Sequence, residues 1–201
     1  MSTIITPADV ARQELPGFQG QLIGPEDGDY ERARSVYNAM IDKRPALIAR
    51  CSQPADVASA IRFARDHELL LAVRGGGHNG AGLGTCDDGV VIDLSLLKQI
   101  EVDPDARTVR VGGGCTWAEV DRATGEHGLA TPSGVISTTG VGGLALGGGT
   151  GHLTRKYGLA IDNLLEAEIV LADGEPTSTR SGPGASTTSR LCTPTRRAAP
   201  T

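Results

Sequence analysis

The sequence has few aromatic residues, no concentration of positive charge and no long apolar run. Aromatic residues make up 3% and hydrophobic residues 39% of the 201 positions, and the formal net charge is −5. The net negative charge argues against a nucleic-acid partner, which needs a concentrated basic surface. Without an apolar run of spanning length, no membrane partner is predicted. Residues 1–12 lack a basic start followed by an apolar stretch, so we expect a cytoplasmic protein.

The cysteines and histidines are too widely spaced for a predicted metal site. No cysteine pair has Cys-x-x-Cys spacing, and no export signal favours a disulfide, so small buried thiols are expected. The histidines lack the close pairing typical of zinc ligands. The residues concerned are Cys51, Cys86, Cys115, Cys192, His67, His78, His127 and His152.

Glycine is the residue in excess. The chain has 28 glycines, roughly twice average usage. They gather mainly in residues 75–89, 112–114, 134–151 and 174–184. Clustered glycine indicates a backbone that turns sharply or approaches something closely.

The first half of the chain predicts a βαβ unit. Apolar spacing favours a helix over residues 29–43, which Pro45 ends. A short buried strand over residues 46–51 precedes a helix from Pro54 to about His67, and a second buried strand covers residues 69–74. Strands joined by a helix in this way are expected to lie parallel.

The second half predicts further strands and one helix. A strand over residues 90–94 is followed by a hairpin whose strands flank residues 103–107. Thr116 and Glu119 fit a capping box for a helix over residues 117–126. A glycine-rich loop to Gly151 and a strand over residues 167–172 follow. We therefore expect a mixed α+β domain over residues 28–174, with an N-terminal arm over residues 1–27.

The last residues change in composition. From Gly174 onward the chain is mostly Thr, Ser, Arg, Pro, Gly and Ala, with Leu191 as its only large aliphatic residue. Such a segment buries too little apolar surface to offset the entropy lost on ordering. Residues 175–201 are expected to be disordered.

The segment Gly75-Gly-Gly-His-Asn-Gly80 matches the G-x-G-x-x-G pattern after a predicted strand. Asp93 follows at about the distance of a ribose-binding acid, so a Rossmann fold is one alternative. That pattern should open a helix whose N-terminus holds the pyrophosphate. Residues 81–89 are poor helix formers, which disfavours this alternative.

A glycine cradle for a phosphorylated cofactor explains the pattern better. Successive glycines let their N–H groups point into one concavity without obstruction by side chains, which favours a phosphate or pyrophosphate. The second glycine-rich stretch, residues 140–151, is a candidate for lining the same ligand. A purely structural origin of one such loop stays open.

Several linked motifs resemble FAD-linked oxidases with the vanillyl-alcohol-oxidase (PCMH) type of flavin domain. Val73-Arg-Gly-Gly-Gly-His-Asn79 resembles the pyrophosphate loop, and residues 90–98 resemble the strand that follows it. Val111-Gly-Gly-Gly-Cys-Thr-Trp117 resembles the next family signature. Residues 140–151 and 155–163 resemble the berberine-bridge-enzyme-like branch. The resemblance covers about residues 28–174.

The resemblance implies an α+β fold with a βαβ subdomain, a mixed or antiparallel sheet and flanking helices. It implies FAD as the cofactor, joined covalently by His78 to the 8α-methyl group of the flavin. A neutral imidazole is a suitable nucleophile for that bond. A histidine that only hydrogen-bonds phosphate is the alternative, because some relatives hold flavin noncovalently. The implied cofactor-binding residues are Arg74, Gly75, Gly76, Gly77, His78, Asn79, Thr139, Gly140, Gly143, Gly147, Gly148, Gly149, Asn163 and Val170.

A second covalent link is not expected. Some relatives use a cysteine two residues after a glycine that precedes the glycine-rich loop. Here that stretch begins at Gly134, and Ile136 occupies the place of the cysteine. An alkyl side chain cannot form the bond. His152 is expected outside the chemistry, and Trp117 in the core.

The resemblance stops at Gly174. Full-length relatives continue into a substrate domain and then return to the flavin domain. Hydride transfer to flavin with O2 as acceptor is the activity implied for the family, but the catalytic base, the substrate and the oligomeric state are not identified by this sequence. A non-catalytic flavin- or nucleotide-binding remnant is the other function class.

A change of reading frame near codon 174 is one hypothesis for the unusual composition of the tail. It predicts that sequencing the source DNA would reveal a family-like continuation in another frame. An intact frame that encodes residues 175–201 would remove this hypothesis.

Overall fold

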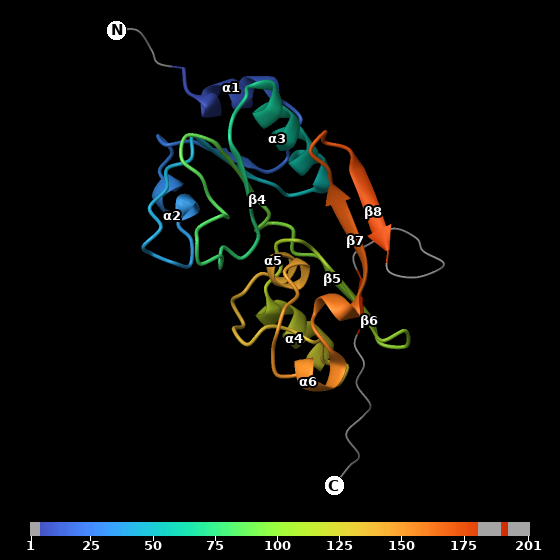
Figure 1. Cartoon of the computed structure of the whole chain (residues 1–201). Helices are drawn as coiled ribbons and strands as arrows, with labels where there is room; N and C mark the ends of the chain where they lie inside the picture. Colours follow the sequence, from blue (N-terminus) through green and yellow to red (C-terminus); the bar gives the residue numbers. More distant parts are fainter. Residues whose placement is uncertain (1–4, 181–189, 193–201) are drawn as a thin grey trace. The chain divides into compact units, whose positions relative to one another are not determined.

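The computed structural model describes residues 5–180 and 190–192, and these divide into two compact units (Figure 1). The first unit contains residues 5–97 and 170–176. The second contains residues 98–169, 177–180 and 190–192. The single domain that we expected over residues 28–174 therefore consists of two units, each with its own sheet and core.

A four-stranded sheet organises the first unit. Its strand order is β1 (Gln21–Ile23), β2 (Leu47–Arg50), β4 (Val90–Asp93) and β3 (Leu71–Arg74). The strand β4 is parallel to both β2 and β3, while β1 is antiparallel to β2. The helix α3 (Pro54–Asp66) connects β2 to β3. The predicted βαβ unit with parallel strands is thus confirmed.

Two apolar clusters hold this sheet. One joins α3 to the buried strands through Leu47, Phe63, Val90 and Ile92, among others. Figure 1 shows α3 beside α1 (Pro7–Glu14), and Ala8 and Ala11 of α1 belong to the same cluster. The other cluster includes Tyr30, Ile48 and Val91. Because Ile48 and Val91 alternate with Leu47, Val90 and Ile92 along their strands, the two clusters cover opposite faces of the sheet.

Part of the expected N-terminal arm belongs to the folded first unit. The helix α1 begins with a capping box, in which the hydroxyl and the N–H of Thr6 both donate to the Asp9 carboxylate. The strand β1 pairs with β2 in the register Leu22–Ala49. The weak periodicity of residues 1–27 did not predict α1 and β1, because these short elements are stabilised by contacts with β2 and α3.

The predicted helix over residues 29–43 is wrong beyond its first turn. The helix α2 spans only Tyr30–Arg34, and Ser35 has extended dihedrals of φ −64° and ψ 141°. A continued helix would use the Ala33 carbonyl to accept a hydrogen bond from the N–H of Tyr37. The Arg74 guanidinium donates to that carbonyl instead, and residues 35–44 run on without helix.

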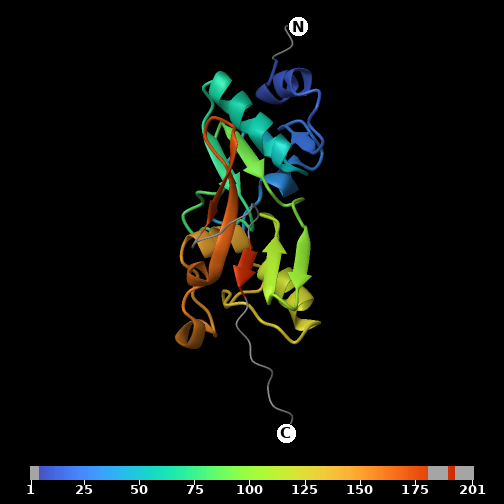
Figure 2. The ribbon, with the colours of Figure 1, turned by 90° about the vertical axis from the view of Figure 1, so that its right-hand side faces the viewer.

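A second sheet of order β5-β6-β9-β7-β8 organises the second unit. The strands β5 (Ile100–Asp103) and β6 (Thr108–Val111) form the predicted hairpin, and Figure 2 shows them beside β9 (Arg190–Cys192), drawn in red. The remaining strands are β7 (Leu164–Val170) and β8 (Pro176–Arg180). The sheet is antiparallel where its register is defined.

Short helices accompany this sheet. The helix α4 (Trp117–Gly125) has the predicted capping box, with the Thr116 N–H 2.7 Å from the Glu119 carboxylate. Trp117 is fully buried, as expected of a core residue. It packs with Val109, Val120 and Val141. The other helices of this unit are α5 (Val141–Leu146), α6 (Thr154–Tyr157) and the 3-10 turn Ile161–Asn163.

The expected disorder of residues 175–201 is wrong where the structure describes them. Residues 176–180 form β8, and residues 190–192 form β9 between β6 and β7. The composition led to a wrong prediction here because it takes no account of backbone hydrogen bonds between paired strands, which can hold a segment that has few apolar residues. The remainder of that prediction, residues 181–189 and 193–201, lies outside the described residues.

The buried acid Asp93 generates a stability prediction. Burial alone raises the pKa of Asp93, but the charge of Arg74 and hydrogen bonds from Ser95, Arg74 and Arg50 outweigh it and hold the pKa below the ordinary 3.8. The folded state therefore keeps this carboxyl ionised to lower pH than the unfolded chain does. Its contribution is complete above the unfolded pKa and is lost as pH falls through the folded pKa.

Asp93→Asn should lower the free energy of unfolding at pH 7 by about 3 kcal/mol, because two buried or half-buried guanidinium groups lose their anion. It should also flatten the loss of stability between about pH 5 and pH 3. Urea unfolding at several pH values measures both. Asp66→Asn, in an exposed pair with Arg65, is the control and should change little. An unchanged pH dependence in Asp93→Asn would contradict the assignment.

Candidate functional site

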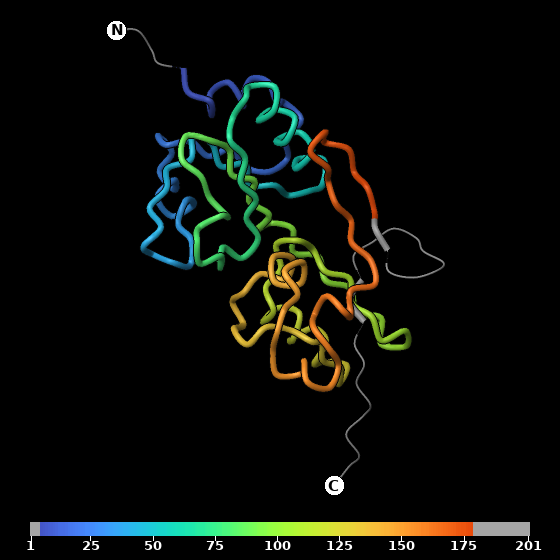
Figure 3. Tube along the Cα trace, in the orientation of Figure 1, coloured from blue at the N-terminus to red at the C-terminus, as the bar shows by residue number. Residues whose placement is uncertain are grey.

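The first glycine loop, residues 75–89, follows β3 and contains no helix. A Rossmann arrangement requires a helix directly after the glycine pattern, so that alternative is contradicted. Figure 3 shows the loop, in teal to green, next to residues 35–44, in light blue. We call residues 35–44 the bracing segment, because hydrogen bonds join it to the loop at several points.

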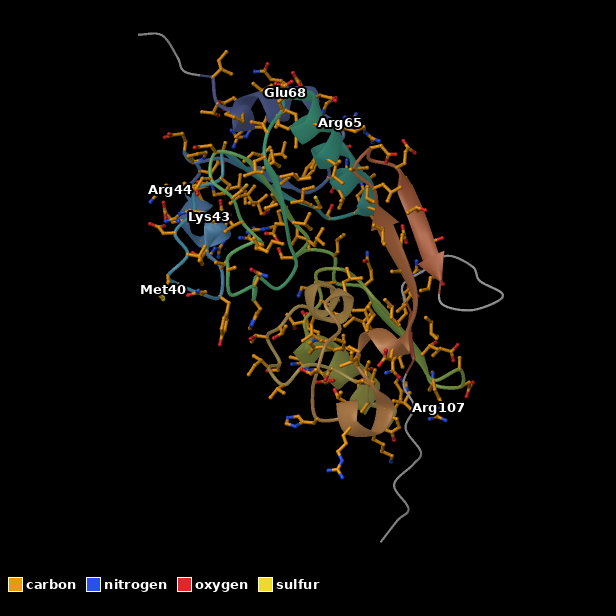
Figure 4. All side chains as sticks on the ribbon, viewed as in Figure 1. Met40, Lys43, Arg44, Arg65, Glu68 and Arg107 are labelled. Carbon is orange, nitrogen blue, oxygen red and sulfur yellow. The ribbon has the colours of Figure 1, made fainter. Side chains whose placement is uncertain are left out.

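The bracing segment contacts the loop through both backbone and side chains. The Tyr37 N–H donates to the Gly77 carbonyl at 3.1 Å, and the Asn38 amide donates to the Gly80 carbonyl at 3.1 Å. The Lys43 ammonium donates to the carbonyls of Gly82 and Thr85 at 3.1 and 3.2 Å. Figure 4 labels Met40, Lys43 and Arg44 along this segment. These bonds fix the loop carbonyls without help from regular secondary structure.

Turns inside the loop use residues suited to them. The Asn79 side-chain oxygen accepts from the N–H groups of Ala81 and Leu83 at 3.1 and 3.0 Å. Gly82 has φ +72°, and a Cβ there would lie 2.7 Å from Cγ2 of Ile41. Glycine is needed at this point both for the left-handed backbone and for the close contact with the bracing segment.

The amide groups of Gly75, Gly76 and Gly77 are available for a ligand. Within the residues that the structure describes, their N–H groups donate no backbone or side-chain hydrogen bond. All three residues are half-buried, and Gly77 has φ +68°. Successive unpaired amides in a concave stretch of backbone are typical of anion-binding nests.

Arg74, directly before the loop, forms hydrogen bonds within the protein. Its guanidinium donates to the Asp93 carboxylate at 3.0 Å and to the carbonyls of Ala33 and Ser35. Arg74 is 6% and Asp93 2% exposed. Arg50 also donates to Asp93, at 3.1 Å. The predicted cofactor-binding side chain of Arg74 is therefore already engaged in a buried network that joins β3, β4 and the end of α2.

The His78 ring lies against the Tyr37 ring. Their centroids are 4.0 Å apart and the ring planes make an angle of 19°, which is a stacked arrangement. His78 is half-buried, and Tyr37 is 66% exposed. The stack restrains the imidazole of His78 on one face.

The second glycine loop, residues 134–151, is only partly a loop. The helix α5 occupies residues 141–146, although it contains Gly142 and Gly143. Burial of Val141 and Ala145 in the core of the second unit outweighs the cost of two helical glycines. Gly140 precedes this helix, while Gly147, Gly148 and Gly149 follow it.

Other predicted cofactor-binding residues of the second unit have contacts within that unit. The Thr139 carbonyl accepts from the Trp117 N–H at 3.0 Å. The Asn163 amide donates to the carbonyls of Tyr157 and Leu159 at 2.9 and 2.8 Å. Val170 belongs to the first unit and packs against the cluster around α3. The predicted set is thus divided between the units, with Arg74 to Asn79 and Val170 in the first.

The described thiols have the properties expected of structural residues. Cys51, Cys86 and Cys115 are buried. Burial raises the pKa of all three, to about 12 for Cys51. A thiol with a raised pKa is mostly protonated at neutral pH and is therefore a poor nucleophile. Ile136, in the place of a second anchor, is half exposed. Among the described residues, no group of three potential metal ligands comes together.

Comparison with known proteins identifies the class of protein. Residues 45–180 match the family described as FAD binding domain. This range includes the first glycine loop with its unpaired amides and the second unit except for β9. The chain therefore contains an FAD-binding domain, with the PCMH-type α+β fold.

The chain belongs to the FAD-binding-domain family of FAD-linked oxidoreductases. It is 41% identical to (R)-6-hydroxynicotine oxidase of Paenarthrobacter nicotinovorans over 158 residues, which are 79% of the chain and 34% of that protein. The crystal structure of 6-hydroxy-D-nicotine oxidase from Arthrobacter nicotinovorans matches with a TM-score of 0.80 at 40% identity, covering 81% of this chain and 36% of that one. The berberine-bridge-enzyme-like protein 1 of Physcomitrella patens matches with a TM-score of 0.80 at 31% identity, covering 84% and 37%.

The chain spans about a third of the length of these relatives. The family match and the structural similarity identify the fold and the FAD-binding family of this chain. No described helix has the length and apolar character that crossing a membrane requires.

The bracing segment was not predicted from the sequence. Tyr37, Asn38 and Lys43 lie about 40 residues before their partners in the loop, and the periodicity around them favours a helix. Their polarity offered no distinctive signal. Only the path of the chain after Arg34 brings them to the loop.

Gly77 and Gly80 provide a matched pair for testing the loop backbone. Gly77 has φ +68°, whereas Gly80 has an ordinary φ and open space around its Cα. Gly77→Ala should destabilise the folded chain by about 1–2 kcal/mol through left-handed strain. Gly80→Ala should change stability by less than about 0.5 kcal/mol. Urea unfolding measures both variants, and equal effects would refute the conformational requirement at Gly77.

Proposed function

We propose that this chain is the FAD-binding part of an oxidoreductase and that His78 joins FAD covalently. The observation that carries the proposal is the braced glycine loop, whose three unpaired amides precede an imidazole held on one face. Relatives of this chain are named as FAD-linked oxidases and oxidoreductases, which supports the same class of chemistry here.

The residues of the first loop fit a dinucleotide cofactor. The N–H groups of Gly75, Gly76 and Gly77 would donate to the pyrophosphate, since they are half-buried and have no described protein partner. A side chain at these positions would obstruct such an approach, which explains the run of glycines. Asn79 would contribute mainly by shaping the turn, because its side-chain oxygen accepts from two loop amides.

The residues of the second unit that the resemblance assigns to FAD remain predictions. They are Thr139, Gly140, Gly143, Gly147, Gly148, Gly149 and Asn163. For Thr139 and Asn163 the local hydrogen bonds support a role through backbone shape rather than through the side chain.

His78 would supply the covalent attachment. An imidazole nitrogen of His78 would replace one hydrogen of the 8α-methyl group, so that one C–H bond and one N–H bond are broken and one C–N bond is formed. The two protons and two electrons released would pass to O2, which becomes hydrogen peroxide. A covalent link would retain the cofactor and make it a stronger oxidant. With Ile136 in the place of the second anchor, one link is proposed.

The proposed activity is oxidation of a small organic substrate. Bound FAD would supply the hydride acceptor, and O2 is the proposed final acceptor. We propose a cytoplasmic location and no nucleic-acid or membrane partner, in keeping with the charge and the lack of long apolar runs. A second candidate is a flavin- or nucleotide-binding chain without catalysis.

Covalent flavin is testable on the purified 201-residue chain. We expect a yellow protein whose flavin stays with the pellet after acid precipitation. His78→Ala should lose all acid-stable flavin without unfolding, because no described thiol is reactive enough to replace it. Absorbance of the pellet and the supernatant measures the division.

His152→Ala is the control, since His152 is an exposed histidine, and it should keep the acid-stable flavin. Colour that is entirely released by acid from the unaltered chain would refute the covalent link but retain FAD binding. A colourless chain that also takes up no added FAD would refute the proposed function. Turnover of FAD-loaded protein with amine and alcohol substrates separates the oxidoreductase from the non-catalytic alternative.

A further inference from the structure

The ring of Tyr37 is exposed to solvent, and it stacks on His78, the proposed attachment residue. Tyr37 is 66% exposed, so its ring is not placed there to fill a core. It stacks on His78 with a centroid distance of 4.0 Å. An exposed aromatic side chain kept against one functional group points to a role in orienting that group.

The backbone of Tyr37 is held on both sides. Its own N–H donates to the Gly77 carbonyl, next to His78, and the following residue, Asn38, donates to Gly80. On the N-terminal side, the Arg74 guanidinium donates to the carbonyls of Ala33 and Ser35. The ring of Tyr37 therefore starts from a backbone position that the loop itself defines.

The end of α2 makes this contact possible. If the helix continued to residue 43, as its periodicity favours, the Tyr37 N–H would donate to the Ala33 carbonyl. The Arg74 guanidinium takes that carbonyl, and the Tyr37 N–H bonds to Gly77 instead. The buried Arg74–Asp93 pair and the stack on His78 are thus linked through residues 33–37.

We propose that Tyr37 is a positioning residue for His78. Its ring limits rotation of the imidazole about the bond to Cβ, so that the imidazole edge is presented in one direction. The expected consequence is that flavin attaches to His78 faster when the aromatic ring is present. This consequence rests on the proposed function. Tyr37 itself forms and breaks no bond in this proposal.

The orientation is tested first without cofactor. Carbon–proton NMR spectra of the chain labelled at its four histidines should contain upfield-shifted imidazole protons of His78, assigned by their loss in His78→Ala and distinguished from those of His67, whose ring centroid lies 4.5 Å from that of Phe63. Tyr37→Leu should remove the upfield shift, and Tyr37→Phe should retain it. Met40→Leu, a change at a 90% exposed position of the bracing segment, should leave it unaltered. A His78 signal that is identical in Tyr37→Leu would overturn the inference.

The consequence is tested by the rate of attachment. FAD is added to cofactor-free protein, and acid-stable flavin is followed with time. Tyr37→Leu should attach FAD about fivefold more slowly, the ratio that corresponds to ~1 kcal/mol of lost stacking. Tyr37→Phe and Met40→Leu should attach it at the rate of the unaltered chain. Circular dichroism and thermal unfolding establish that each variant is folded, which the exposure of Tyr37 leads us to expect.

The outcomes separate the inference from the proposed function. Attachment at an unchanged rate in Tyr37→Leu would overturn the inference and retain the proposed function. Slow attachment in both Tyr37→Leu and Tyr37→Phe would also overturn it, because the hydroxyl rather than the ring face would then matter. Failure of the unaltered chain to attach FAD would refute covalent attachment at His78, and the NMR comparison alone would then decide whether Tyr37 orients His78.

Discussion

The buried pair of Arg74 and Asp93 is the interaction on which the first unit's candidate site depends. It lies where β3 and β4 end, and Arg50 of β2 adds a second donor to the same carboxylate. Charges with so little exposure are stable only when paired and hydrogen-bonded. The remaining donors of Arg74 reach the carbonyls of Ala33 and Ser35, so one side chain connects the sheet to the end of α2.

This network gives the glycine loop a fixed support. A run of glycines has high conformational entropy and little intrinsic preference for one shape. The bracing segment compensates with hydrogen bonds from Tyr37, Asn38 and Lys43 to loop carbonyls. Those bonds use the carbonyls and leave the amides of Gly75, Gly76 and Gly77 for an anion. The loop is thereby preorganised, which would reduce the ordering cost of binding the phosphate-bearing cofactor that we propose for it.

Local signals predicted many of the elements. The strands β2, β3 and β4, the helix α3 and the hairpin β5–β6 follow from short-range apolar patterns and turn residues. Glu119, three residues after Thr116, correctly marked the start of α4. Elements that depend on distant partners were missed: α5 contains two glycines but is held by buried Val141 and Ala145, and β9 exists through pairing with β6 and β7.

The two glycine-rich segments could be identified from the sequence alone, and the resemblance of their motifs to known flavin domains implied the FAD-binding family and His78 as the candidate attachment residue, because such motifs consist of residue types at close spacing. Tertiary structure decided that α2 ends at Arg34, that Arg74 lies in a buried ion pair and that Tyr37 stacks on His78. Each of these joins groups about 20 to 40 residues apart, and the end of α2 depends on the Arg74 guanidinium and the Tyr37 N–H competing for the Ala33 carbonyl. Such competition is settled only when the strands bring the groups together, since local periodicity carries no information about a distant guanidinium.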